Sequence, residues 1–90
     1  MKNQVDSLHD LIAGIPEDLQ IQSKLSVAIA ARIESLMRQE GLSKKQFADA
    51  LGRRPSEVTK WLSGEHNFTI ATLSRLSAYF GKSIIEVPDL

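Results

Sequence analysis

Residues Ser43 to Gly64, SKKQFADALGRRPSEVTKWLSG, predict two short helices joined by a tight turn, and the rest of the chain has to accommodate this arrangement. The first helix is expected over about 44–51, with Ser43 as the N-cap whose hydroxyl accepts a free backbone N–H. Gly52 follows directly and suits the positive φ angle of the turn. Pro55 lies in the first turn of the second helix, where its missing N–H needs no partner. Helices this short are stable only when they pack on a shared core.

The apolar residues of this stretch recur three and four positions apart, which places them on one helix face. They are Phe47, Ala48, Leu51, Val58, Trp61 and Leu62. The outer face of the second helix is then small, polar and cationic. It consists of Pro55, Ser56, Thr59, Lys60 and Ser63. Such a face suits the major groove of DNA, where hydroxyl groups and cations meet the edges of the bases.

The stretch resembles the helix-turn-helix of the phage-repressor/Cro-like (XRE) regulators. The matching residues are Phe47, Ala48, Leu51, Gly52, Val58 and Trp61, followed by WLSG. The resemblance continues through HNFTIATLSRLSAYFG and covers about residues 26–85. Within that family, SEVTKWLSGEHNFT is most similar to the antitoxins of host-inhibition-of-growth toxin–antitoxin pairs. Arg53 departs from the pattern, because the position after the turn glycine is usually apolar in this motif.

The resemblance implies an all-α fold, a five-helix lambda-repressor-like DNA-binding bundle with an additional N-terminal helix and a short extended C-terminal tail. We expect an acidic helical extension over 1–22 and the DNA-binding domain over 23–82, with its motif at 43–64. The tail over 83–90 is expected to contribute to a dimer contact.

The resemblance also implies which residues meet DNA. It places Pro55, Ser56, Thr59 and Lys60 on the base-reading face, with Lys60 best suited to guanine O6 and N7. It places Lys44 beside the DNA backbone, where Lys45, Arg53 and Arg54 are expected to bind phosphates with it. A phosphate on the far side is expected to meet His66, Asn67 and Thr69, which lie in the next loop and at the next helix N-terminus.

Further helices are expected on the N-terminal side of the motif. A helix from about Ser23 to Glu40 has an apolar face of Leu25, Ile29, Ile33, Leu36 and Met37. Residues 16–18, Pro-Glu-Asp, are typical of a helix start, and the pattern leaves open whether 17–22 joins the next helix or forms a separate turn. A short amphipathic helix within 4–13 is predicted by the spacing of Val5, Leu8, Leu11 and Ile12.

On the C-terminal side, Thr69 is expected to be the N-cap of a helix over 70–80. Its core face is predicted to consist of Ile70, Leu73, Leu76 and Phe80. Residues 83–87, SIIEV, form a β-branched run, and the pattern leaves open a short strand or a last helical turn. As a strand, this run would need a partner, and we expect it to pair with its copy in a second subunit.

Charge is segregated along the chain, although the net charge is zero. Residues 1–22 hold one basic residue against four acidic ones, a charge of −3. Residues 41–64 hold five basic residues against two acidic ones, a charge of +3. The positive charge therefore coincides with the motif, where contacts with phosphates would need it.

The sequence shows no signature of an enzyme or of a metal or cofactor site. It lacks cysteine and a glycine-rich phosphate loop, and neither His9 nor His66 has ligand-spaced acids or a triad serine nearby. No cofactor is therefore expected. No apolar run approaches the roughly 18 residues of a membrane span, and the N-terminus has no signal-peptide pattern. We expect a cytoplasmic protein without a membrane partner.

Together these observations favour a sequence-specific transcriptional repressor that binds double-stranded DNA. The resemblance implies that it binds a palindromic operator as a homodimer. The resemblance implies that it is an antitoxin that represses its own operon and has a toxin protein as partner. The alternative is a protein-interaction module that neutralises a toxin and binds DNA little. Residues 1–22 are expected to complete the core or form a dimer interface, ahead of a role in binding a toxin.

Overall fold

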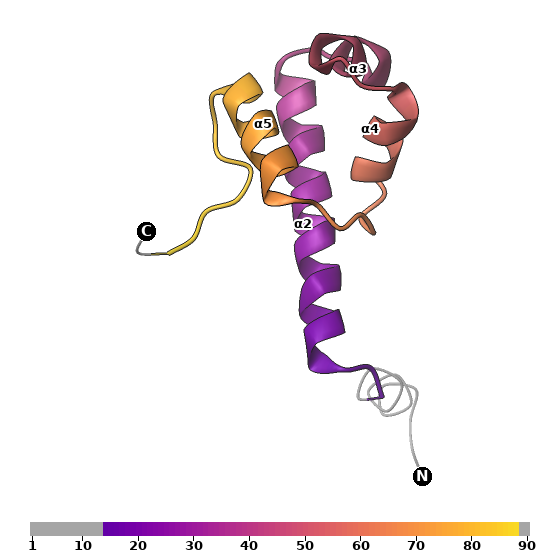
Figure 1. The fold of residues 1–90 in the computed structure, drawn as a ribbon, viewed down its shortest axis with the longest axis vertical. Helices are drawn as coiled ribbons and strands as arrows, with labels where there is room; N and C mark the ends of the chain where they lie inside the picture. Colours follow the sequence, from indigo (N-terminus) through magenta and orange to yellow (C-terminus); the bar gives the residue numbers. More distant parts are fainter. Residues whose placement is uncertain (1–13, 89–90) are drawn as a thin grey trace.

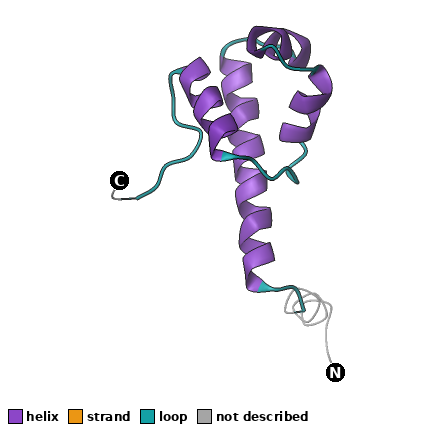
Figure 2. Ribbon diagram, viewed as in Figure 1, coloured by secondary structure: helices purple, strands orange, loops and turns teal. Residues whose placement is uncertain are grey.

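The computed structural model describes residues 14–88, and in this part of the chain it contains four α-helices and no strand. The helices are α2 (Glu17–Gln39), α3 (Lys44–Leu51), α4 (Pro55–Trp61) and α5 (Ile70–Phe80), drawn in Figures 1 and 2. The all-α prediction is confirmed. The helix predicted within 4–13, and with it the full helix count, lies outside the described residues.

The long helix α2 is the axis of the molecule. It begins directly after Pro16, whose carbonyl accepts hydrogen bonds from the amides of Leu19 and Gln20. Glu17 and Asp18 lie in the first turn, where their negative charges interact favourably with the positive end of the helix dipole. The residues 17–22, which the pattern left open, are therefore part of α2. The three shorter helices pack around the C-terminal half of α2, and its N-terminal half extends beyond them (Figure 1).

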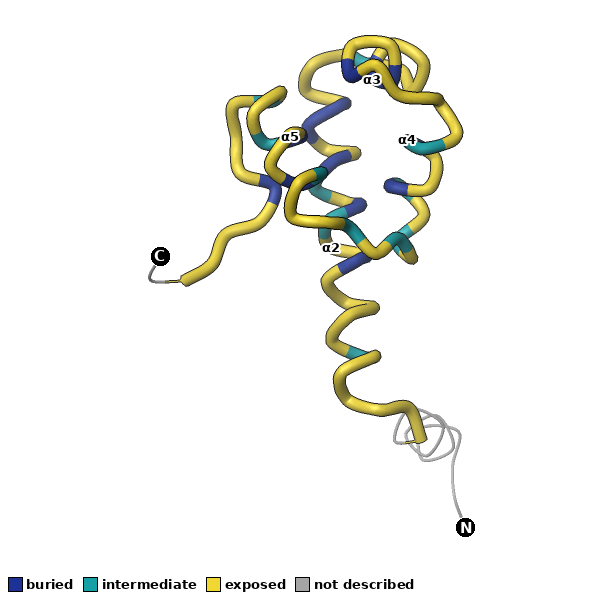
Figure 3. The backbone as a smooth tube through the Cα atoms, in the orientation of Figure 1, coloured by how far each residue is buried: buried dark blue, intermediate teal, exposed yellow. Residues whose placement is uncertain are grey.

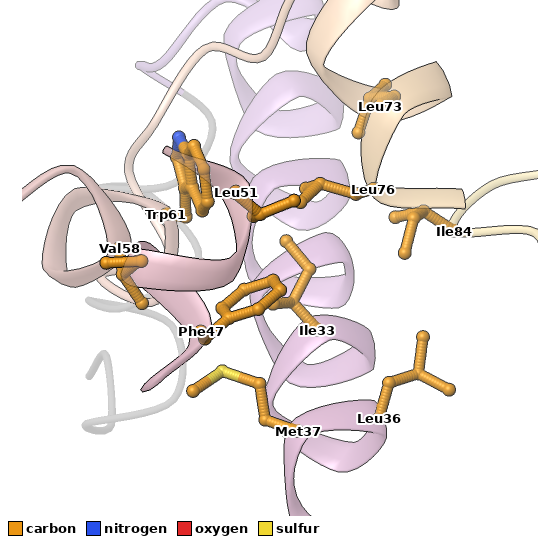
Figure 4. Packing of buried hydrophobic residues seen from close by; sticks show 11 residues of the cluster. Ile33, Leu36, Met37, Phe47, Leu51, Val58, Trp61, Leu73, Leu76 and Ile84 are labelled. Carbon is orange, nitrogen blue, oxygen red and sulfur yellow. The ribbon is translucent and has the colours of Figure 1, made fainter. Parts of the chain in front are cut away.

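One apolar core joins all four helices. Its buried members are Ile33, Leu36, Met37, Phe47, Ala48, Leu51, Val58, Trp61, Leu73, Leu76 and Ile84. Their side chains point toward one another from the four helices and the tail (Figure 4), and the buried positions gather around the C-terminal half of α2 (Figure 3). Val58 and Trp61 are buried as predicted, and Leu62 is partly buried against the cluster.

Two residues predicted to face the core lie on the surface instead. Leu25 is 55% exposed and Ile70 is 81% exposed. Leu25 lies in the N-terminal half of α2, and this half is mostly exposed because the other helices pack around the C-terminal half (Figure 3). Ile70 is the first residue of α5, and within residues 14–88 no neighbouring element covers it.

The predicted helix boundaries in the motif are confirmed by their hydrogen bonds. The Ser43 hydroxyl accepts from the Gln46 amide at 3.1 Å, and the Gln46 side chain accepts from the Ser43 amide at 2.9 Å. This reciprocal capping box satisfies two backbone donors at the start of α3. At the start of α5, the Thr69 hydroxyl accepts from the Thr72 amide at 3.1 Å.

The C-terminal tail, residues 83–88, forms neither the strand nor the helical turn that the pattern left open. The Ser83 carbonyl accepts two hydrogen bonds from the Arg32 guanidinium of α2, at 3.0 and 3.2 Å. The Ile84 amide donates to the Ser77 hydroxyl of α5 at 3.1 Å, and the Ile84 side chain is buried. These anchors hold the tail in an irregular conformation, because the described residues offer it no neighbouring strand.

Candidate nucleic-acid interface

The turn between α3 and α4 sets the position of the exposed face of α4. Gly52 has φ 66°, a left-handed conformation that L side chains rarely adopt. The amide of Arg53 donates to the Ala48 carbonyl at 2.8 Å and so closes the end of α3. Ala48 itself is fully buried in the core.

A long-range hydrogen bond also holds this turn. The Arg75 guanidinium of α5 donates to the carbonyl of Leu51, the last residue of α3. A cation at the end of a helix donates a hydrogen bond to a carbonyl that has no partner within the helix, and its charge interacts favourably with the negative end of the helix dipole. Arg75 therefore connects the orientation of the motif to α5, a role that no pattern in the sequence indicates.

We expect Arg75→Ala to lower the free energy of unfolding by about 1–2 kcal/mol, because it removes a charged hydrogen bond between helices. Urea unfolding followed by tryptophan fluorescence measures this loss. Arg38→Ala is the matched control, since the Arg38 side chain pairs with Glu34 on the surface of α2, and such pairs contribute about 0.3–0.5 kcal/mol. Equal losses in both variants would contradict the role assigned to Arg75.

The outer face of α4 presents the four residues predicted to read bases. Pro55, Ser56, Thr59 and Lys60 are all exposed. The Thr59 hydroxyl donates its proton to the Pro55 carbonyl at 3.2 Å, which leaves its oxygen free to accept. The side chains of Ser56 and Lys60 have no partner among residues 14–88, so they are available to a ligand.

A shallow hollow lies between α4 and the start of α5. It is lined by Arg53, Arg54, Ser56, Glu57, Lys60, Trp61, His66 and Thr72. Three of these side chains are cations, and the one carboxylate, Glu57, lies 3.4 Å from the Arg53 guanidinium. The hollow is thus a positively charged surface next to the base-reading face, and anionic phosphates are the ligands that it suits.

The predicted phosphate residues do not all meet in this hollow. Arg53, Arg54 and His66 line it, and the His66 ring packs edge-on against Phe68 with centroids 4.7 Å apart. Asn67 is exposed in the same loop. The other three predicted residues lie elsewhere: Lys44 and Lys45 are exposed at the start of α3, and the Thr69 hydroxyl caps α5.

Two residues of the hollow were missed by reasoning from the sequence. Glu57 follows Arg53 by four positions, a spacing that places the two side chains together on one side of the helix start and would have indicated the ion pair. Thr72 lines the hollow because the loop after α4 brings the first turn of α5 beside it. A local sequence pattern does not predict the course of that loop.

Residues 14–88 also bear on metal binding and on membrane insertion. No group of three or more metal-ligating side chains lies together there. None of the four helices has the length and apolar character required to cross a bilayer.

Comparison with known proteins gives one match. The helix-turn-helix family matches residues 33–87, more than half of the chain. The matched region holds α3, the turn, α4, α5 and the C-terminal part of α2. No curated protein and no solved structure matches this chain.

Proposed function

The chain belongs to the phage-repressor/Cro-like helix-turn-helix family, and we propose that it is a sequence-specific repressor that binds double-stranded DNA through α4. The family is a DNA-binding regulatory one and not an enzymatic one. The observation that carries the proposal is the surface of α4: exposed Ser56 and Lys60, without partners in residues 14–88, lie beside a hollow that holds Arg53 and Arg54.

Three side chains of α4 supply different contacts to bases in this proposal. Lys60 donates to guanine O6 and N7. The Ser56 hydroxyl donates or accepts. Thr59 acts as an acceptor, because its proton is engaged by the Pro55 carbonyl, and it therefore suits the amino group of adenine or cytosine. Pro55, without a polar side chain, allows close approach at the start of the helix.

The cations supply affinity and register in this proposal. Arg53, Arg54, Lys44 and Lys45 bind phosphates, and the loop residues His66 and Asn67 with Thr69 meet the backbone on the far side. Contacts of this kind carry little sequence information, and they weaken with salt because counterions are released when they form.

The finer proposal is that the protein acts as a homodimer on a palindromic operator, because one recognition helix reads only half a site. We further propose, from the similarity of SEVTKWLSGEHNFT to antitoxins, that it represses its own operon in the cytoplasm and has a toxin as partner. The acidic residues 1–22 support the alternative, a module that neutralises a toxin and binds DNA little, since they would complement a basic partner.

Titration with two duplexes tests the proposal: the DNA immediately upstream of the reading frame and a scrambled duplex of equal length. We expect the wild type to prefer the upstream DNA, with log Kd changing by about 0.9 per log unit of salt for each phosphate contact. Lys60→Ala is expected to lose about 1–2 kcal/mol on the upstream DNA and most of its preference. Lys45→Ala, the matched control, should weaken binding to both duplexes alike.

The outcomes separate the two functions. Equal binding of the wild type to both duplexes would contradict the sequence-specific repressor. Absence of DNA binding together with salt-insensitive binding to a protein partner would support the toxin-neutralising module instead.

A further inference from the structure

The apolar side of α2 continues past the end of the core. Ile33 is fully buried and Ile29 is partly buried against the cluster. At the same four-residue spacing come Leu25 and then Ile21, which are 55% and 52% exposed. Within residues 14–88, the stripe thus continues for two further turns beyond the buried positions, with its side chains about half exposed. Large apolar side chains in a continuous exposed row mark a surface for association.

This stripe forms one wall of an apolar groove. The opposite wall comes from the loop after α4, from α5 and from the tail, and the apolar lining is Ile21, Leu25, Ile29, Phe68, Leu73 and Ile85. A second hollow shares Leu73 and Ile85 and adds Ile70 and Val87. The two hollows share Leu73 and Ile85 and therefore lie next to one another along α2, α5 and the tail, and they are together called the groove below.

We propose that this groove is the surface through which two copies of the chain form a dimer. Eleven residues line the first hollow and eight line the second, with two in common. These 17 different residues approach the roughly 20–30 residues that each partner contributes to a standard interface. Ile70 and Val87, 81% and 61% exposed, lie on it and would be covered.

The groove carries few charged side chains. Asp18 and Glu86 are the only acidic residues that line it, and no lysine or arginine does. Few charges and many apolar side chains are typical of the core of a homodimer interface.

The shape of the groove also suits a two-fold arrangement. The N-terminal half of α2 protrudes from the bundle, whereas α5 and the tail border a hollow (Figure 1). A two-fold axis would place this half of α2 in each copy against the hollow of the other.

This inference rests on the proposed function, because the reading of two half-sites requires two recognition helices. In the view of Figure 1, α4 and the tail lie on opposite sides of α2. The groove contains no residue of α4 and shares only His66 with the cationic hollow. Pairing through the groove would therefore leave both base-reading faces free to meet half-sites about one DNA turn apart.

Sedimentation equilibrium of the full chain without DNA tests the interface. We expect the wild type to be a dimer and Leu25→Glu to raise the dimer dissociation constant about 30-fold or more, the effect of losing a central apolar contact. Leu19→Glu is the matched control, because Leu19 is also on α2 and 49% exposed but lines neither of the two hollows that make up the groove. It should leave the dissociation constant unchanged. Far-ultraviolet circular dichroism confirms that both variants are folded.

Two results would overturn the inference: a dimer that Leu25→Glu and Leu19→Glu weaken equally, or a wild type that stays monomeric at all concentrations. If the wild type is monomeric, a hydrophobic dye is added to the wild type and to Leu8→Glu. Stronger dye binding by Leu8→Glu than by the wild type would mean that residues 1–13 of the same chain occupy the groove. Sedimentation is measured without DNA, so it tests the interface independently of the repressor function. A wild type that forms the dimer but shows no preference for the upstream DNA would contradict the proposed repressor and would not contradict the dimer interface.

Discussion

Replacing Phe47 with alanine is expected to lower the free energy of unfolding by about 3–5 kcal/mol. Phe47 is fully buried, and its ring contacts three others: Trp61 at 6.1 Å, Tyr79 at 5.6 Å and Phe80 at 5.2 Å between centroids. It therefore joins α3 to both α4 and α5. A small domain has roughly 5–15 kcal/mol of stability in total, so the variant should be largely unfolded at a modest urea concentration.

The fluorescence of Trp61, the one tryptophan of the chain, follows this unfolding, because Trp61 is buried in the native state. Leu19→Ala is the control, since this exposed leucine lies outside both the core and the apolar groove and its loss should change stability by about 0.5 kcal/mol or less. If Phe47→Ala cost no more than Leu19→Ala, Phe47 would not be the centre of the core.

Removing the two arginines of the hollow, in the double variant Arg53→Gln/Arg54→Gln, is expected to weaken DNA binding about 100-fold near 0.1 M salt. Each phosphate contact contributes about 0.9 to the slope of log affinity against log salt, so the slope should become shallower by about 2. The loss is strengthened because Glu57, which Arg53 neutralises at 3.4 Å, would be left facing the phosphates. Fluorescence anisotropy over a series of salt concentrations measures both quantities.

The control for this experiment is Lys24→Gln/Lys82→Gln, which removes the same charge from residues outside the hollow. Its affinity should fall only slightly and its salt slope should be unchanged, because contact with phosphates and not net charge sets the slope. Equal slopes in the two double variants would mean that the hollow does not bind DNA phosphates.

The local structure of the motif could be predicted from the sequence. The N-cap at Ser43, the left-handed Gly52 and the start of α4 at Pro55 each depend on residues within a few positions of one another. Hydrogen bonds and backbone preferences at this range act within one segment, so the pattern of residues reports them. The same holds for the outer face of α4, because helical spacing alone separates its exposed residues from the buried Val58 and Trp61.

What the sequence left undetermined depends on how the segments meet in space. Spacing identified the apolar side of α2 but not the point at which the bundle stops covering it, and so Leu25 and Ile70 were wrongly assigned to the core. The bond from Arg75 to Leu51 and the gathering of Arg53, Arg54 and His66 in one hollow join residues far apart in the chain. The crossing of helices around the core determines such contacts, and a local pattern carries no information about that crossing.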